Sequence, residues 1–281
     1  MKKPVFTGSS VAIITPFKNG RVDYEALKKL INIQKNAGTA AITVCGTTGE
    51  ASTLSREERF AVIAFTKAVA GDMPVIAGSG SNSTEHAVRF SLDAERAGAD
   101  ALLVVTPYYN KATQKGLLEH YEAIADSVTV PVIAYNVPSR TGVSFRPETY
   151  AILARHPNIN GVKEASGDFG LFIKTLELCG DEMNIWSGND DVTVPMMALG
   201  AKGVISVAAN IIPEKMAEMT RLCAEGRVTE AADMQIRFSG LIAQLFSEVN
   251  PIPVKAAMAE IGLCGGELRL PLTEISPENR N

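Results

Sequence analysis

Cysteine and histidine are scarce in this sequence, and neither is spaced for a metal site or a disulfide framework. The 281 residues include 4 cysteines and 3 histidines. Cys45, Cys179, Cys223 and Cys264 form no CxxC pair, and the histidines show no HExxH spacing. We therefore expect core-packing thiols in a reducing compartment, histidines with surface or packing roles, and no metal.

Dense blocks of basic residues and long apolar runs are also missing. The formal net charge is -4, which argues against a nucleic acid or an anionic membrane surface as a partner. Near the N-terminus the apolar run is broken by Gly8, Ser9, Ser10 and Pro16, so neither a signal peptide nor a membrane span fits. We expect a cytoplasmic protein that acts on small molecules.

Apolar residues are plentiful, at 46% of the chain. They occur in short runs that alternate with amphipathic segments about every thirty residues, which is typical of stacked βα units around a parallel sheet. The predicted strands are 11–14, 41–44, 74–77, 101–105, 132–135, a sixth that leads to Lys163, 184–186 and 203–207.

Helix signals fall between these strands. Asp23 is placed to cap a helix that runs to about Asn36, and Ser55 and Glu58 form a capping box for the next one. Three further helices are predicted at about 213–225, 229–249 and 253–261. The pattern predicts an α/β fold, a TIM (β/α)8 barrel with a C-terminal helical extension. We place the catalytic barrel at 1–225 and the extension at 226–281.

Catalytic groups of a TIM barrel stand where its strands end, and those loops face one mouth. Here the strand exits carry Thr47 and Thr48, Tyr108 and Tyr109, Tyr135 and Arg140, Lys163, and Gly188 with Asn189 and Asp190.

Lys163 is the candidate nucleophile among these residues. A lone lysine after a strand is most often a solvated surface charge. At a pKa of about 10.4 only about one amine in 2,500 is neutral at pH 7, so imine chemistry requires the barrel mouth to lower the pKa. A shift of about 2.5 units corresponds to about 3.4 kcal/mol, which desolvation can supply. Glu164 would oppose the shift if it pointed inward.

Two glycine-containing stretches suggest nucleotide sites but lack the necessary residues. Residues 78–83 (GSGSNS) resemble a dinucleotide loop without its third glycine, so we interpret them as a tight strand exit. Thr47 and Thr48 lie between glycines with no Walker lysine, which excludes a P-loop and leaves a small anion cradle of hydroxyls and backbone N–H groups.

Four motifs in order carry a family resemblance: GTTGE at 46–50, TPYYN at 106–110, YNVPSRTG at 135–142 and GVKEASGD at 161–168. With this combination the chain resembles, over essentially its whole length, the dihydrodipicolinate synthases of the pyruvate-dependent class I aldolase family, which also contains N-acetylneuraminate lyase. The resemblance implies a Schiff base between pyruvate and Lys163, with no organic cofactor or metal.

The resemblance also implies roles for the other strand exits. Tyr135 would be the acid/base phenol, linked through Thr47 to Tyr109, which in this family reaches into the neighbouring subunit's site. Thr47 and Thr48 would hold the pyruvate carboxylate.

Arg140, at the site entrance, would pair with the carboxylate of the aldehyde substrate, which suits its planar fork of donors. Gly188 and the backbone of Ile205 would line the pocket near the lysine.

The implied reaction condenses pyruvate with L-aspartate 4-semialdehyde to 4-hydroxy-tetrahydrodipicolinate, in lysine and diaminopimelate biosynthesis. The implied assembly is a homo-oligomer, a tetramer built as a dimer of dimers. One alternative is a sister aldolase or lyase acting on a sugar-derived 2-keto acid such as N-acetylneuraminate, in which an arginine at position 140 is unusual. Another is an inactive paralogue that binds small molecules, which would have lost Lys163, Tyr135 or Thr47.

Regulation is where the sequence departs from the family pattern. Many bacterial members bind lysine in a dimer-interface cavity through a histidine pair after GTTGE and a glutamate after the GSG motif. The matching positions here are Arg56, Arg59 and His86, while Asn82 and Tyr108 remain. Because the acidic partner of the ligand's ammonium group is missing, we expect inhibition by lysine to be weak or absent.

Overall fold

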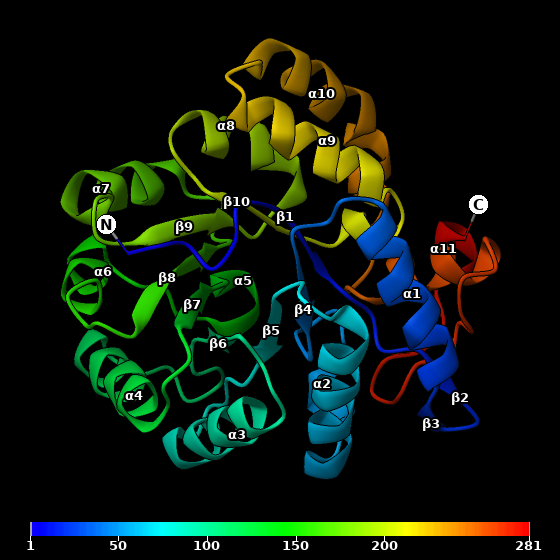
Figure 1. Cartoon of the computed structure of the whole chain (residues 1–281), viewed down its shortest axis with the longest axis horizontal. Coiled ribbons are helices and arrows are strands. Elements are labelled where there is room, and N and C mark those ends of the chain that lie inside the picture. The colour runs from blue at the N-terminus through cyan, green and yellow to red at the C-terminus, as the bar shows by residue number, and fades with distance from the viewer. Residues whose placement is uncertain (1, 281) are drawn as a thin grey trace.

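A closed barrel of eight parallel strands forms the centre of the computed structural model, which describes residues 2–280 (Figure 1). The barrel strands are β1 (Gly8–Ala12), β4 (Ala41–Val44), β5 (Val75–Gly78), β6 (Ala101–Val105), β7 (Val132–Asn136), β8 (Ile159–Glu164), β9 (Asn184–Ser187) and β10 (Gly203–Ser206). The ring closes where β1 pairs with β10 on one side and with β4 on the other. The predicted TIM barrel is thus confirmed; Met1 and Asn281, the outer ends of the two predicted regions, lie outside the described residues.

Helices surround the strands in an outer ring (Figure 1). They are α1 (Tyr24–Asn36), α2 (Arg56–Ala70), α3 (Thr84–Arg96), α4 (Gln114–Ser127), α5 (Pro138–Thr141), α6 (Pro147–Leu153), α7 (Phe169–Cys179), α8 (Thr193–Ala198), α9 (Pro213–Ala224), α10 (Val228–Gln244) and α11 (Ile252–Glu260). Short 3-10 turns are η1 (Ala51–Thr53), η2 (Asp190–Val192), η3 (Ala208–Asn210) and η4 (Pro277–Asn279). Among residues 2–280, none of the helices has the length and apolarity needed to cross a bilayer.

The predicted helix caps are present in the structure. Asp23 accepts a hydrogen bond from the backbone N–H of Ala26 at the start of α1. Ser55 and Glu58 form both halves of a capping box at the start of α2. These local signals fix where two helices begin, and therefore the length of the loops that precede them.

The first strand and the last long helix differ from the prediction. Strand β1 begins at Gly8, because Ser9 and Ser10 are buried and pair in the sheet although they are polar; Ser10 Oγ lies 2.9 Å from Thr43 Oγ1. Helix α10 ends at Gln244, five residues before the predicted end, and the following turns bury Asn250. Apolar periodicity alone does not detect either feature.

Two small elements were absent from the sequence prediction. A two-stranded antiparallel hairpin, β2 (Phe17–Lys18) and β3 (Arg21–Val22), follows β1. Helix α5 forms within the motif that was expected to be a loop, and it carries Arg140. Both are too short to produce a periodic pattern.

The barrel interior is closed at the end opposite the strand exits. Phe6 stacks on Trp186 with ring centroids 5.2 Å apart, and both are buried. The Nζ of Lys2 donates to the carbonyls of Ala154, His156 and Ile159, each at 2.6 Å. This floor leaves the strand exits as the open end of the barrel.

Candidate active site

Lys163 and Tyr135 stand side by side inside the barrel. They are register partners on β8 and β7, and Lys163 Nζ lies 4.4 Å from the centroid of the Tyr135 ring. Lys163 is 5% exposed and Tyr135 is 8% exposed. A methyl group on Gly188 would lie 3.0 Å from Lys163 Cε, so the glycine after β9 makes room for the lysine side chain.

The environment of Lys163 favours its neutral form. Burial lowers the pKa of Lys163 to about 8; Asp190 opposes this shift and Arg140 adds to it. At that pKa about one amine in ten is neutral at pH 7. The direction and its cause, desolvation, are those that imine chemistry requires.

Glu164 points away from the barrel interior, so it is not the carboxylate that opposes the shift. Its carboxylate accepts hydrogen bonds from Asn136 Nδ2 at 3.1 Å, Tyr150 Oη at 2.8 Å and the backbone N–H of Ser166 at 2.7 Å. These bonds join the exits of β7 and β8 to α6. Burial raises the pKa of Glu164, and these partners lower it.

Tyr135 keeps its phenolic proton in this setting. Burial raises its pKa, while Arg140 and a hydrogen bond with Thr47 oppose the rise. Tyr135, Thr47 and Arg140 line the same cavity, and a phenol near a hydroxyl and a cation is suited to pass a proton to or from a bound molecule.

Thr47 and Thr48 follow β4 but differ in exposure. Thr47 is exposed at the mouth, whereas Thr48 is buried and its Oγ1 accepts a hydrogen bond from Asn250 Nδ2 at 3.0 Å. Because a hydroxyl has one proton to donate, this bond leaves the Thr48 O–H free for an acceptor such as a carboxylate.

A cavity of about 330 Å³ opens beside this group. Thr47, Tyr135, Tyr108, Arg140 and Arg59 line it, together with residues 249–251 and 271–272. Arg140 is exposed on its wall, where a guanidinium is placed to meet an anionic substrate group. The volume suits a small molecule.

The other residues that were predicted to form the pocket do not line this cavity. Lys163, Thr48, Gly188 and Ile205 are not among the lining residues; Ile205 is fully buried on β10. Tyr109 is 90% exposed, has a backbone φ of 73° and does not line the cavity of its own chain.

The arginines that follow the GTTGE motif have partners within the chain. Arg56 pairs with Asp93 at 2.5 Å. Arg59 donates to the carbonyl of Gly78 at 2.8 Å, and its guanidinium lies 4.2 Å from the centroid of the Phe90 ring.

The other three residues of this predicted regulatory group are more dispersed. His86 is on α3, with its ring 6.3 Å from that of Phe90, and the carbonyl of Asn82 accepts a hydrogen bond from Asn110. Only Tyr108 of these three lines the cavity. The structure therefore brings Arg59 and Tyr108 to one wall and leaves Arg56, Asn82 and His86 outside it.

The sequence does not indicate the contacts of several polar residues near the site. Asp190, at a strand exit, is buried and accepts hydrogen bonds from the backbone N–H groups of Val207 and Ala208. Asn250 and Lys255 come from the C-terminal extension, and no local pattern indicates that they meet the loop after β4.

Within residues 2–280 no group of three metal-ligating side chains is placed to hold a metal ion.

Comparisons with known proteins show which family the chain is similar to. The model of the dihydrodipicolinate synthetase family matches residues 5–281. A 4-hydroxy-tetrahydrodipicolinate synthase from Thermoanaerobacter sp. (strain X514) is 54% identical over 278 residues, which is 98% of this chain and 94% of that protein.

Two solved structures are similar over the same length. The chloride-inhibited dihydrodipicolinate synthase from Acinetobacter baumannii, complexed with pyruvate, has a TM-score of 0.95 at 45% identity and covers 98% of this chain and 95% of its own. A monomeric dihydrodipicolinate synthase variant has a TM-score of 0.96 at 42% identity, with 98% and 94% covered.

Proposed function

The chain belongs to the dihydrodipicolinate synthetase family, and we propose that it condenses pyruvate with L-aspartate 4-semialdehyde to give 4-hydroxy-tetrahydrodipicolinate. It would thus be a lyase of the class I aldolase type in lysine and diaminopimelate biosynthesis. The observation that carries this proposal is the buried Lys163 amine, with its lowered pKa, beside the Tyr135 phenol.

The proposed reaction begins when the neutral Lys163 amine adds to C2 of pyruvate and water leaves, which forms an imine. Loss of a C3 proton gives an enamine, whose carbon attacks the aldehyde of the second substrate. The amino group of the adduct then adds to the imine carbon and releases Lys163 as the ring closes. Tyr135, with Thr47, relays the protons, and the protonated imine itself accepts the electrons.

The proposed binding roles are those that the family resemblance implies, and two positions in the structure support them. Thr47 and Thr48 would hold the pyruvate carboxylate, and the Thr48 O–H is free to donate to it. Arg140 on the cavity wall would pair with the carboxylate of the aldehyde substrate. Gly188 and Ile205 would shape the pocket around Lys163.

The proposal includes a homo-oligomer, a tetramer built as a dimer of dimers, in the cytoplasm. Tyr109, 90% exposed in the single chain, would complete the proton relay in a neighbouring subunit's site. We also retain the division into a barrel (1–225) and a helical extension (226–281).

Regulation by lysine is proposed to be weak or absent. His86 stands at the position that matches the family's glutamate, so a lysine ammonium would lack its acidic partner, and Arg59 adds a cation beside Tyr108. Initial rates with 0 to ~10 mM lysine test this, and inhibition at low micromolar lysine would overturn it.

Borohydride reduction in the presence of pyruvate, followed by peptide mass mapping, tests the mechanism. The expected result is a reduced pyruvyl adduct on Lys163, and an adduct on any other residue would contradict it. A coupled assay that offers aspartate semialdehyde or N-acetylneuraminate separates the two substrate classes. Turnover of N-acetylneuraminate alone would replace the proposed second substrate.

A further inference from the structure

Two segments that are far apart in the sequence meet beside the candidate active site. The first, residues 46–54, is named here the threonine loop; it carries Thr47 and Thr48. The second, residues 262–272, is named the C-terminal strap; it follows α11. Glu50 in the loop contacts Lys255 of α11, 205 residues further along the chain.

Glu50 is the centre of this contact. Its side chain is fully buried, one carboxylate oxygen accepts from Lys255 Nζ and the other from the backbone N–H of Arg269 at 3.2 Å. Its backbone is left-handed, with φ 51° and ψ 38°. Residues other than glycine rarely adopt this conformation. The side-chain contacts of Glu50 hold the turn after Thr48 in place together with the bond from its backbone N–H to the Thr47 carbonyl at 3.1 Å.

Lys255 ties the same carboxylate to the strap. Its Nζ also donates to the carbonyl of Glu267 at 2.7 Å and lies 4.1 Å from the centroid of the Phe17 ring. The buried charge is therefore paired and hydrogen-bonded, which is the condition under which a buried ion pair holds two segments together.

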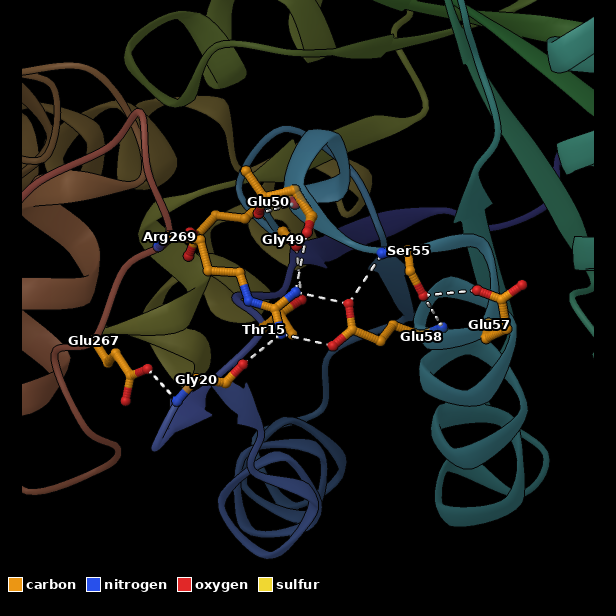
Figure 2. Close-up of polar contacts among 10 residues, drawn as sticks. Thr15, Gly20, Gly49, Glu50, Ser55, Glu57, Glu58, Glu267 and Arg269 are labelled. Carbon is orange, nitrogen blue, oxygen red and sulfur yellow. Dashed lines mark hydrogen bonds and ion pairs between the residues drawn. The ribbon is translucent and has the colours of Figure 1, made fainter.

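Arg269 fastens the far end of the threonine loop (Figure 2). Its guanidinium donates to the carbonyls of Thr53 at 3.0 Å and Gly20 at 2.8 Å. It also binds both carboxylate oxygens of Glu58, at 2.6 and 2.7 Å. Glu58 in turn caps Ser55 at the start of α2, so the loop is held where it enters that helix.

Asn250 adds a contact to Thr48 itself. Its Nδ2 donates to Thr48 Oγ1 at 3.0 Å, so Thr48 is the acceptor in this bond and its own O–H remains available as a donor. Pro271 and Leu272, the last two residues of the strap, line the cavity.

We propose that Glu50, Lys255, Arg269 and Asn250 are positioning residues for pyruvate, which set the threonine loop and the Thr48 hydroxyl in the geometry that the pyruvate carboxylate requires. The inference rests on the proposed function, because it assigns the carboxylate to Thr47 and Thr48. In this arrangement the C-terminal extension controls substrate affinity by setting the position of the threonine loop.

Arg269→Met tests the proposal, with Arg280→Met as its control. Arg280 also pairs with a glutamate, Glu260, near the C-terminus, but it makes no contact with the threonine loop. The half-saturating pyruvate concentration for borohydride trapping is expected to rise about tenfold or more in Arg269→Met, with kcat within about threefold of wild type. Arg269→Lys should recover part of the affinity, and Arg280→Met should match wild type.

Equal half-saturating pyruvate in wild type and Arg269→Met would overturn the proposal. If Arg269→Met does not fold, Asn250→Ala decides, because it removes the bond to Thr48 and leaves the ion pairs intact; an unchanged pyruvate requirement there would also overturn it. Failure of pyruvate to label wild type at all would instead refute the proposed function.

Discussion

Two buried lysines near the same end of the barrel differ in one electrostatic contact. Lys255 lies 4.1 Å from the Phe17 ring centroid and Lys163 lies 4.4 Å from that of Tyr135, so each ammonium faces an aromatic ring. Lys255 also contacts the Glu50 carboxylate, whereas no carboxylate within residues 2–280 is at ion-pair distance from Lys163. Burial lowers the pKa of both, and only for Lys255 does a contacting acid oppose it. The contacting carboxylate thus distinguishes Lys255, which pairs with Glu50, from Lys163, the proposed nucleophile.

Substitution of the two lysines should differ most in its effect on catalytic activity. Lys163→Met is expected to lower kcat/KM by at least about 10³-fold, because the covalent intermediate has no amine to form on. Lys255→Met should still be labelled by pyruvate and borohydride. Peptide mass mapping of both variants checks this, and a pyruvyl adduct in Lys163→Met would refute the assignment of the nucleophile.

Lys255→Met and Lys163→Met should change the free energy of unfolding in opposite directions. Lys255→Met leaves the Glu50 carboxylate buried without its partner, so we expect a loss of about 3–5 kcal/mol in the free energy of unfolding. Lys163→Met removes an unpaired buried charge and should raise it by up to about 3 kcal/mol at pH 7. Urea denaturation at matched protein concentration measures both. A loss of stability in Lys163→Met would contradict the contrast.

The stability gained in Lys163→Met should depend on pH, in the direction set by the lowered pKa of Lys163. The pKa of Lys163 is about 8 in the folded protein and about 10.4 when unfolded, so the folded state disfavours the ammonium. The cost is complete below pH 8 and disappears as the pH rises toward 10.4. The stabilisation by Lys163→Met should therefore shrink above pH 8.

The dependence of the reaction rate on pH tests whether the pKa of Lys163 is lowered. The value of kcat/KM for pyruvate should fall about tenfold per pH unit below pH 8, because the neutral Lys163 amine is the reactive form. Steady-state rates between about pH 6 and 9.5, with a stability control at each pH, measure the midpoint. A midpoint near 10 would mean that Lys163 has an ordinary pKa.

The smallest expected effect is the change in the pKa of Lys163 when one nearby carboxylate is replaced by an amide. Asp190 raises the pKa of Lys163 from a distance, so Asp190→Asn should move the midpoint of that profile down by about half a unit. Glu164→Gln should leave it within about 0.2 units, because the Glu164 carboxylate faces Tyr150 and Asn136 instead. The reverse order of effects would show that Glu164 is the acid coupled to the lysine.

The sequence allowed the barrel and the centre of the site to be predicted for one physical reason. Parallel strands place their C-terminal ends at one edge, so Lys163, Tyr135 and Thr47 had to converge once eight strands were identified. The sequence motifs around these three residues are short and complete, so each could be identified from its own stretch of sequence. The start of β1 was missed because Ser9 and Ser10 are polar yet buried in the sheet.

The contacts of the C-terminal extension could not be predicted in the same way. Asn250, Lys255 and Arg269 meet residues about two hundred positions earlier, and each is ordinary in its local sequence. Only the path of the chain after α10 decides which residue they meet. The motif glutamate Glu50 was the available clue, because a carboxylate at a tight turn inside a barrel mouth needs a buried cation.

The closure of the sheet between β1 and β10 has a consequence for synthesis. A ribosome makes the chain in order, so β1 has no partner at one of its edges until Gly203 to Ser206 have been translated. Arg269 is made after every strand of the barrel. A nascent chain that has produced Lys163 therefore carries the proposed nucleophile on an open sheet, before the contacts of Arg269 with the threonine loop can form. Only chains extended past the strap contain all the residues of the proposed site.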